Sequence, residues 1–171
     1  MIHGQIHTQI VRHKDQVDRW FQSQRDKVDL PFYSSFDIRD SGEKISPVDA
    51  NIFPAGFNNI CQTDKETSAD LVRDYLDSNY GSTCKNIVLV TEEHFKNPYY
   101  WDNVWTLQSL IEQAGRHVKL AMPTALSETF EVESASGHQL KVHPAHRVGS
   151  TIEVDGLQPD LIISNNDFSH E

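Results

Sequence analysis

The sequence is poor in the features that mark extracellular and membrane-spanning proteins. It has two cysteines, Cys61 and Cys84, which are too few for a disulfide framework or a cysteine metal site. Two reduced thiols are typical of a cytoplasmic protein, and Cys61 reads as a small buried residue. No run of about 18 apolar residues is present, and the first residues lack the pattern of a signal peptide. We therefore expect a cytoplasmic location.

Glycine is also scarce where nucleotide-binding loops would need it. The eight glycines form no G-x-G pair and no G-x-x-x-x-G-K-[ST] motif. A nucleotide, if one is needed, must then be held elsewhere. The histidine pairs His3/His7 and His143/His146 lack a third ligand at a recognisable spacing, so we expect no metal site.

The chain has fewer basic than acidic residues, which limits the kinds of partner that it can bind. The chain of 171 residues carries 15 Lys and Arg against 25 Asp and Glu, a formal net charge of -10. The electrostatic field of such a negative chain repels phosphate backbones and anionic membranes, so we expect neither nucleic acid nor a membrane as a partner. Hydrophobic residues make up 37% of the chain, which indicates a modest core or a face that packs on something further.

The clearest structural signal is a strand–helix–strand unit. Residues 86–90 form a continuous apolar run, as expected of a strand buried on both faces. A helix is predicted over 98–114, with Pro98 at its start and Gly115 after its end, and a strand over 117–122. Residues 159–164 return to a buried strand. A βαβ unit of this length implies a right-handed crossover and a mainly parallel sheet.

The remaining elements are weaker. The sequence predicts a leading helix over 5–26, a strand over 32–39, an ordered loop over 47–59, a helix over 64–79 and a small antiparallel insertion over 129–154. Asp64 or Thr67 could cap the helix, and Gly81 would end it. The predicted fold class is α/β: one Rossmann-like domain over 1–171, with 1–27 as its leading helix. A parallel strand that ends in a polar turn normally leads to another element, so we expect the natural polypeptide to continue.

Polar clusters follow three of the predicted strands, where ligands of parallel sheets bind. If these strands are adjacent, the clusters meet at one edge. The amide-rich loop after the first strand supplies donors and acceptors that suit a small zwitterion such as an amino acid. Tryptophans 101 and 105 are expected in the core. No catalytic residue is identified. The candidate substrate-binding residues are Asp37, Arg39, Asp49, Asn51, Asn58, Asn59, Glu92, Asn165, Asn166 and Asp167.

Two segments carry a resemblance to a known family. Residues 33–39, Tyr-Ser-Ser-Phe-Asp-Ile-Arg, are followed by residues 47–59, Pro-Val-Asp-Ala-Asn-Ile-Phe-Pro-Ala-Gly-Phe-Asn-Asn. Together they resemble the glutamate–cysteine ligases of the proteobacterial and cyanobacterial type. Residues 159–169, Pro-Asp-Leu-Ile-Ile-Ser-Asn-Asn-Asp-Phe-Ser, are similar to a second landmark of that family. The resemblance covers nearly the whole chain.

The resemblance implies a fold and a reaction. Members of that family are much longer than this chain and are similar to glutathione synthetase, with a Rossmann-like domain ahead of an ATP-grasp domain. The implied reaction is the first step of glutathione biosynthesis: ATP phosphorylates the glutamate side-chain carboxylate, and the cysteine amine attacks the acyl phosphate. ATP and Mg²⁺ are then expected in the full-length enzyme and none bound by this chain alone, which lacks the ATP-grasp domain and which we expect to be inactive by itself.

Two other readings stay open at this point. The chain could belong to a different ATP-grasp peptide ligase, with another substrate and the same division into domains. It could also be a stand-alone module that binds an amino acid without catalysis. Continuation of the reading frame past Glu171 would favour a ligase.

Overall fold

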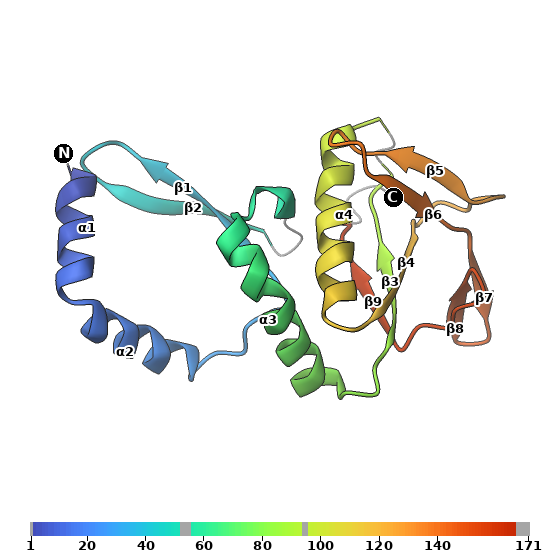
Figure 1. The fold of residues 1–171 in the computed structure, drawn as a ribbon, viewed down its shortest axis with the longest axis horizontal. Helices are drawn as coiled ribbons and strands as arrows, with labels where there is room; N and C mark the ends of the chain where they lie inside the picture. The colour runs from blue at the N-terminus through green and yellow to red at the C-terminus, as the bar shows by residue number, and fades with distance from the viewer. Residues whose placement is uncertain (1, 52–55, 94–95, 167–171) are drawn as a thin grey trace. The chain divides into compact units, whose positions relative to one another are not determined.

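A computed structural model describes residues 2–51, 56–93 and 96–166. The chain divides into two compact units, residues 1–52 and 53–171. Figure 1 shows the elements of each unit. Among the described residues, no helix is both long enough and apolar enough to cross a bilayer.

The first unit begins with two helices, α1 (Ile2–Arg12) and α2 (Lys14–Arg25), where the sequence predicts one. The break lies at His13, whose φ of -113° and ψ of 25° fall outside the helical region. The apolar side chains used to predict a single amphipathic helix stay largely exposed within the unit, including Ile10, Trp20 and Phe21. The apolar spacing continues through the break, so periodicity could not reveal it.

The first unit ends in a hairpin of β1 (Ser35–Asp40) and β2 (Ile45–Asn51). One expectation is wrong here, and one condition is not met. The first predicted strand is not adjacent to the parallel strands in their sheet, because it pairs antiparallel with β2 alone. Residues 47–51 are strand rather than loop: both strands of a two-stranded sheet are edges, and Pro47 sits beside a bulge, where a missing N–H is tolerated. Of the loop, Ile52 to Ala55 lie outside the described residues.

The second unit is built on a five-stranded sheet in the order β5-β6-β4-β3-β9. Strands β3 (Asn86–Val90), β4 (His117–Ala121) and β9 (Leu161–Ser164) are parallel, with β3 between the other two. These are the three strands that the sequence predicts for one sheet, and the prediction is confirmed. Ile87, Val88 and Leu89 are fully buried, because the sheet is covered on both faces.

Helix α4 (Pro98–Gln113) connects β3 to β4 and packs against β4 and β5. Its buried residues include Trp101, Val104, Leu107 and Ile111, spaced by three or four as one face of a helix requires. Helix α3 (Gln62–Tyr80) packs beside α4. The predicted burial of Trp101 in the core is confirmed, whereas Trp105 is half-buried and stacks on His138.

The predicted insertion at 129–154 divides into two parts. Strands β5 (Phe130–Glu133) and β6 (Gln139–Val142) pair antiparallel, and β6 extends the main sheet by lying parallel to β4. Strands β7 (Ala145–Val148) and β8 (Thr151–Val154) form a separate hairpin. Val154 of β8 packs with Val88 and Ala121, so the hairpin covers one face of the sheet.

Helix α3 starts earlier than predicted. It begins at Gln62, with Cys61 in the N-cap position, so Asp64 and Thr67 lie inside the helix and do not cap it. Cys61 is exposed, contrary to the expectation that it is buried, and its thiol donates to Asp64 Oδ2 at 3.0 Å. The end is as predicted: Gly81 has a φ of +82°, a value that glycine adopts at little cost.

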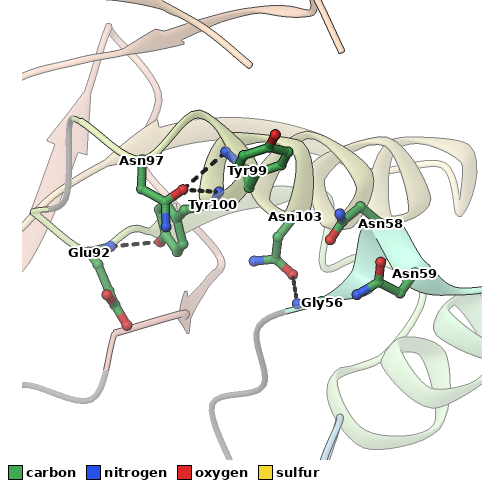
Figure 2. A pocket seen from close by; sticks show the side chains of 8 residues that line it. All are labelled: Gly56, Asn58, Asn59, Glu92, Asn97, Tyr99, Tyr100 and Asn103. Atoms are coloured by element: carbon green, nitrogen blue, oxygen red, sulfur yellow. Dashed lines mark hydrogen bonds between the residues drawn. The ribbon is translucent and has the colours of Figure 1, made fainter. Parts of the chain in front are cut away.

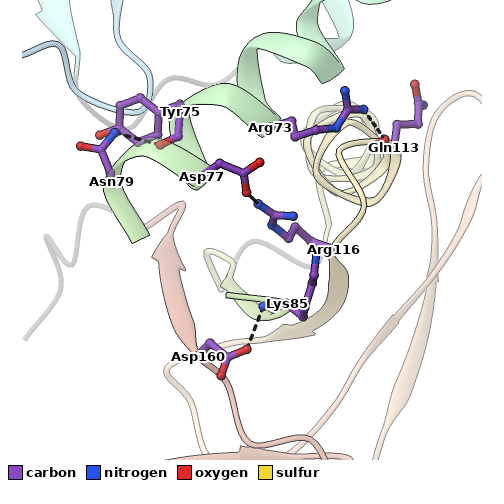
Figure 3. A network of polar contacts seen from close by, with 8 residues as sticks. All are labelled: Arg73, Tyr75, Asp77, Asn79, Lys85, Gln113, Arg116 and Asp160. Atoms are coloured by element: carbon purple, nitrogen blue, oxygen red, sulfur yellow. Dashed lines mark hydrogen bonds and ion pairs between the residues drawn. The ribbon is translucent and has the colours of Figure 1, made fainter. Parts of the chain in front are cut away.

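A polar network at the amino end of the sheet joins helix α3 and three strands (Figure 3). Arg116, directly before β4, pairs with Asp77 of α3 at 2.5 Å. Asp160, directly before β9, accepts backbone hydrogen bonds from Lys85 and Asn86 at the start of β3, each at 2.8 Å. These contacts hold α3 to the start of β4, and the start of β9 to the start of β3, at this end of the sheet.

Candidate functional site

A pocket of about 460 Å³ lies in the second unit, beside the start of α4 (Figure 2). Its walls come from three segments: the short 3-10 helix η1 (Phe57–Asn59) and the glycine before it, the turn after β3, and the first turns of α4. The turn follows the carboxyl end of a parallel strand, the usual position of a ligand site in such sheets. The lining residues are mostly amides and tyrosines: Gly56, Asn58, Asn59, Glu92, Asn97, Tyr99, Tyr100 and Asn103.

The amino end of α4 is capped by the side chain of the residue directly before the helix. Asn97 is the N-cap, and its carboxamide oxygen accepts from the backbone N–H groups of Tyr99 at 3.1 Å and Tyr100 at 3.4 Å. Pro98 at the first helical position has no N–H to offer. The donors that would bind a phosphate at a helix start are therefore already engaged.

Asn103 joins the pocket wall to the helix. Its side chain is 1% exposed, and its Oδ1 accepts from the backbone N–H groups of Gly56 and Phe57, each at 2.9 Å. These two bonds hold the entry to η1 against α4 across 46 residues or more of sequence. Gly56 has a φ of +104°, so the turn before η1 requires glycine.

Tyr100 links the two strand ends beneath the pocket. Its hydroxyl accepts from the backbone N–H of Glu92 at 2.8 Å and from Asn165 Nδ2 at 3.2 Å. Asn166, next along the chain, donates from Nδ2 to the Thr91 carbonyl oxygen at 3.0 Å. The carboxyl ends of β3 and β9 thus meet, as the sequence predicts for these two strands.

The predicted site residues fall into separate groups. Asn58, Asn59 and Glu92 come together in the pocket. Asn165 and Asn166 are buried, and their side chains bind Tyr100 and the backbone of the neighbouring strand. Asp167 lies outside the described residues.

Four further candidates lie on the hairpin of the first unit. Asp37 stands opposite Asp49 across the two strands, and Asn51 Nδ2 donates to Asp49 Oδ2 at 3.3 Å. Arg39 is exposed, two residues along β1 from Asp37, and the two form no ion pair among the described contacts. The hairpin therefore presents three carboxyl or amide side chains and one guanidinium within a short stretch of sheet.

The sequence reasoning missed Gly56, Asn97, Tyr99, Tyr100 and Asn103 as pocket residues. Two of them carried a usable signal. An asparagine directly before a helix-starting proline predicts an N-cap, and hence a turn facing the ligand edge. Asn103 lies on the apolar face of the predicted helix, three residues after Tyr100 and four before Leu107. A polar residue at such a position predicts a buried amide that needs a hydrogen-bond partner.

The acidic and histidine side chains are dispersed. Within residues 2–51, 56–93 and 96–166, no group of three or more His, Cys, Asp or Glu side chains is placed to hold a metal ion. His143 bonds through Nδ1 to the Thr129 hydroxyl at 3.1 Å, and burial lowers the pKa of its imidazole. Both cysteines are free thiols.

Comparisons with known proteins found a matching family model and a similar solved structure. The family model for glutamate-cysteine ligase, GshA, matches residues 7–171. A crystal structure of a proposed gamma-glutamylcysteine synthetase from Methylobacillus flagellatus KT is similar, with 29% sequence identity and a TM-score of 0.82. The match covers 92% of this chain and 37% of that chain, so this chain spans little more than a third of that protein's length. No curated protein matches the sequence.

Proposed function

Because the chain belongs to the glutamate-cysteine ligase family GshA, we propose that it is the amino-terminal, substrate-binding portion of a glutamate–cysteine ligase. That enzyme joins the glutamate side-chain carboxylate to the cysteine amine through an acyl phosphate, in glutathione biosynthesis. The family match over residues 7–171 carries the proposal. Support comes from the amide-lined pocket at the carboxyl end of β3, whose donors and acceptors suit an amino acid.

The second unit supports a Rossmann-like assignment for this portion of the enzyme. Strands β4, β3 and β9 are parallel, and α4 forms the crossover between β3 and β4. In folds of this class the ligand edge is the carboxyl end of the strands, where the pocket lies. An ATP-grasp domain would then belong to the part of the longer polypeptide that this chain does not span.

The pocket does not fit a nucleoside triphosphate. The N–H groups at the start of α4 are engaged by Asn97, and the described residues that line the pocket include no basic side chain. Phosphate groups bind where free backbone donors or cations are available. We therefore propose that ATP and Mg²⁺ bind outside this chain, in the remaining part of the enzyme.

The test compares the complete polypeptide with the 171-residue chain. The complete protein should form γ-glutamylcysteine and ADP from glutamate, cysteine, ATP and Mg²⁺, identified by mass spectrometry and a coupled ADP assay. The shorter chain should show no turnover above background. Product formation with a different amino-acid pair only would point to another peptide ligase, and turnover by the shorter chain would contradict the division proposed here.

A further inference from the structure

An apolar groove of about 490 Å³ lies in the first unit, along the end of α1, the break at His13 and the helix α2. Its apolar side chains are Ile10, Val17, Trp20 and Phe21. The rings of Trp20 and Phe21 pack edge to face, with their centroids 5.0 Å apart. Trp20 is 57% exposed, Phe21 is 55% exposed and Ile10 is 49% exposed, so the aromatic pair leaves much of its surface open.

The groove contains no ionic side chain. Beside the apolar residues, its described lining holds Gln9, His13 and Gln16, and no Lys, Arg, Asp or Glu. The charged residues Lys14 and Asp18 of α2 pair with each other and do not line the groove. Aromatic side chains with little charge are typical of the centre of a protein–protein interface. The occupant that fits is therefore an apolar protein surface rather than an ion.

The first unit has no core of its own to hold these helices. Among residues 4–51, no residue is buried. Helices as short as α1 and α2, with 11 and 12 residues, are marginal in water unless they pack on something. The two-stranded sheet of β1 and β2 is marginal for the same reason. The unit therefore requires a further surface to cover its apolar side chains.

The length of the related protein indicates where such a surface comes from. The match with the similar crystal structure covers 92% of this chain and 37% of that chain, so well over half of that protein lies outside the match. A surface within the same polypeptide is present at a high effective concentration, whatever the concentration of the protein. A second copy would cover the groove only by dimerisation, and the first unit would lose its cover on dilution.

We propose that this groove is a docking surface for an apolar segment in the part of the longer polypeptide that this chain does not span. Trp20 and Phe21 are its central contacts. The docking rests on the proposed function in one respect, that this chain is a portion of a longer ligase. It requires no substrate and no catalysis.

Site-specific photo-crosslinking of the complete polypeptide tests the occupant. Trp20 is replaced by p-benzoylphenylalanine, an aromatic side chain that bonds to neighbouring C–H groups on irradiation, and the linked peptides are identified by mass spectrometry. Gln22 is the matched control position, because two residues along an α-helix rotate the side chain by about 200° and Gln22 does not line the groove. If the probe at Trp20 prevents folding, the same probe at Phe21 replaces it.

The probe at Trp20 should cross-link within one polypeptide to a residue outside the 171 residues of this chain, and the probe at Gln22 should not. Cross-links between two polypeptides would identify a second copy as the occupant. Cross-links to residues 53–171 would place the covering surface within this chain, and the absence of cross-links would show that the groove is free. Each of these three outcomes would overturn the proposal.

Hydrogen exchange separates the docking from the proposed function, because it needs no substrate. In the complete polypeptide, Trp20→Gln should speed amide exchange over residues 2–25 by more than about tenfold, the effect of losing a central aromatic contact. Gln22→Ala should change it by less than about twofold. Protection that depends on Trp20 in a protein without ligase activity would retain the docking surface and remove the reaction. Ligase activity with equal exchange in both variants would retain the reaction and remove the docking surface.

Discussion

Arg116 and Asp77 form an ion pair in which the guanidinium side chain is 2% exposed and the carboxylate side chain is 38% exposed. The pair joins the last turns of α3 to the start of β4. Its two partners are not equivalent, because the Arg116 side chain is almost fully desolvated, whereas the Asp77 carboxylate stays partly hydrated. The cost of breaking the pair therefore falls on the arginine.

Asp77→Asn should lower the free energy of unfolding by about 1–3 kcal/mol, because a buried guanidinium loses its counter-charge. Because Asp77 is half-exposed, the loss of unfolding free energy should be smaller than for a fully buried ion pair. Asp70→Asn on the same helix is the control, since its pair with Arg73 is exposed and should contribute less than about 0.5 kcal/mol. Urea unfolding followed by circular dichroism measures both, and equal effects would contradict this reading.

Asp160 should make stability depend on acid pH. Backbone hydrogen bonds from Asn86 and Lys85 hold the pKa of its carboxyl below the ordinary value of 3.8. A lowered pKa in the folded state means that the stabilisation is present above the ordinary value and is lost as the pH falls below it. Asp160→Asn should therefore be destabilising at pH 7, and its difference from the wild type should shrink at acid pH. Urea midpoints measured across that range would contradict this if the difference stayed constant.

Tyr100→Phe should destabilise the second unit by about 1–2 kcal/mol, because the Glu92 N–H and the Asn165 amide lose a shared partner. Tyr99→Phe is the matched control. Its side chain is largely exposed on the same turn, so its effect should lie within about 0.5 kcal/mol. Thermal unfolding of both variants compares them directly, and a Tyr100→Phe variant as stable as Tyr99→Phe would show that the hydroxyl is dispensable.

Arg39→Lys in the complete enzyme should raise the KM for glutamate, a loss on the order of 2 kcal/mol if the guanidinium binds a carboxylate bidentately. Because Arg39 is exposed and has no ion pair with Asp37 among the described contacts, the melting temperature should not change. Arg25→Lys, at the exposed end of α2, is the control. A lower melting temperature with an unchanged KM would remove Arg39 from the substrate site.

The centre of the parallel sheet could be predicted because β3 is buried on both faces and reads as an unbroken apolar run at 86–90. The run at 161–163 predicts a strand of the same sheet, although β9 is not buried on both faces, since Ile162 is exposed. The strand at 35–40 could be predicted as a strand but not assigned to a sheet. The alternation of apolar and polar residues reports only the local geometry of a strand. Whether β2 could pair with β1 depended on whether Pro47 could occupy a strand, which the bulge allows.

The site could be predicted only in part. Asn58, Asn59 and Glu92 stood out because they follow a loop and a strand end, where ligands bind. Asn103 did not, since the apolar periodicity of α4 marks it as one polar residue among core residues. Its role depends on two backbone N–H groups more than 40 residues away, a contact that only the folded chain brings about.

The position of β3 between β4 and β9 has a consequence for synthesis of the chain. Strand β4 follows β3 closely in sequence, whereas β9 begins only at Leu161. Until that residue leaves the ribosome, one edge of the apolar strand β3 has no partner for its backbone groups. Exposed apolar edges are the usual starting points of aggregation. A nascent chain that pauses before residue 161 should therefore depend on chaperones more than one that pauses after residue 164.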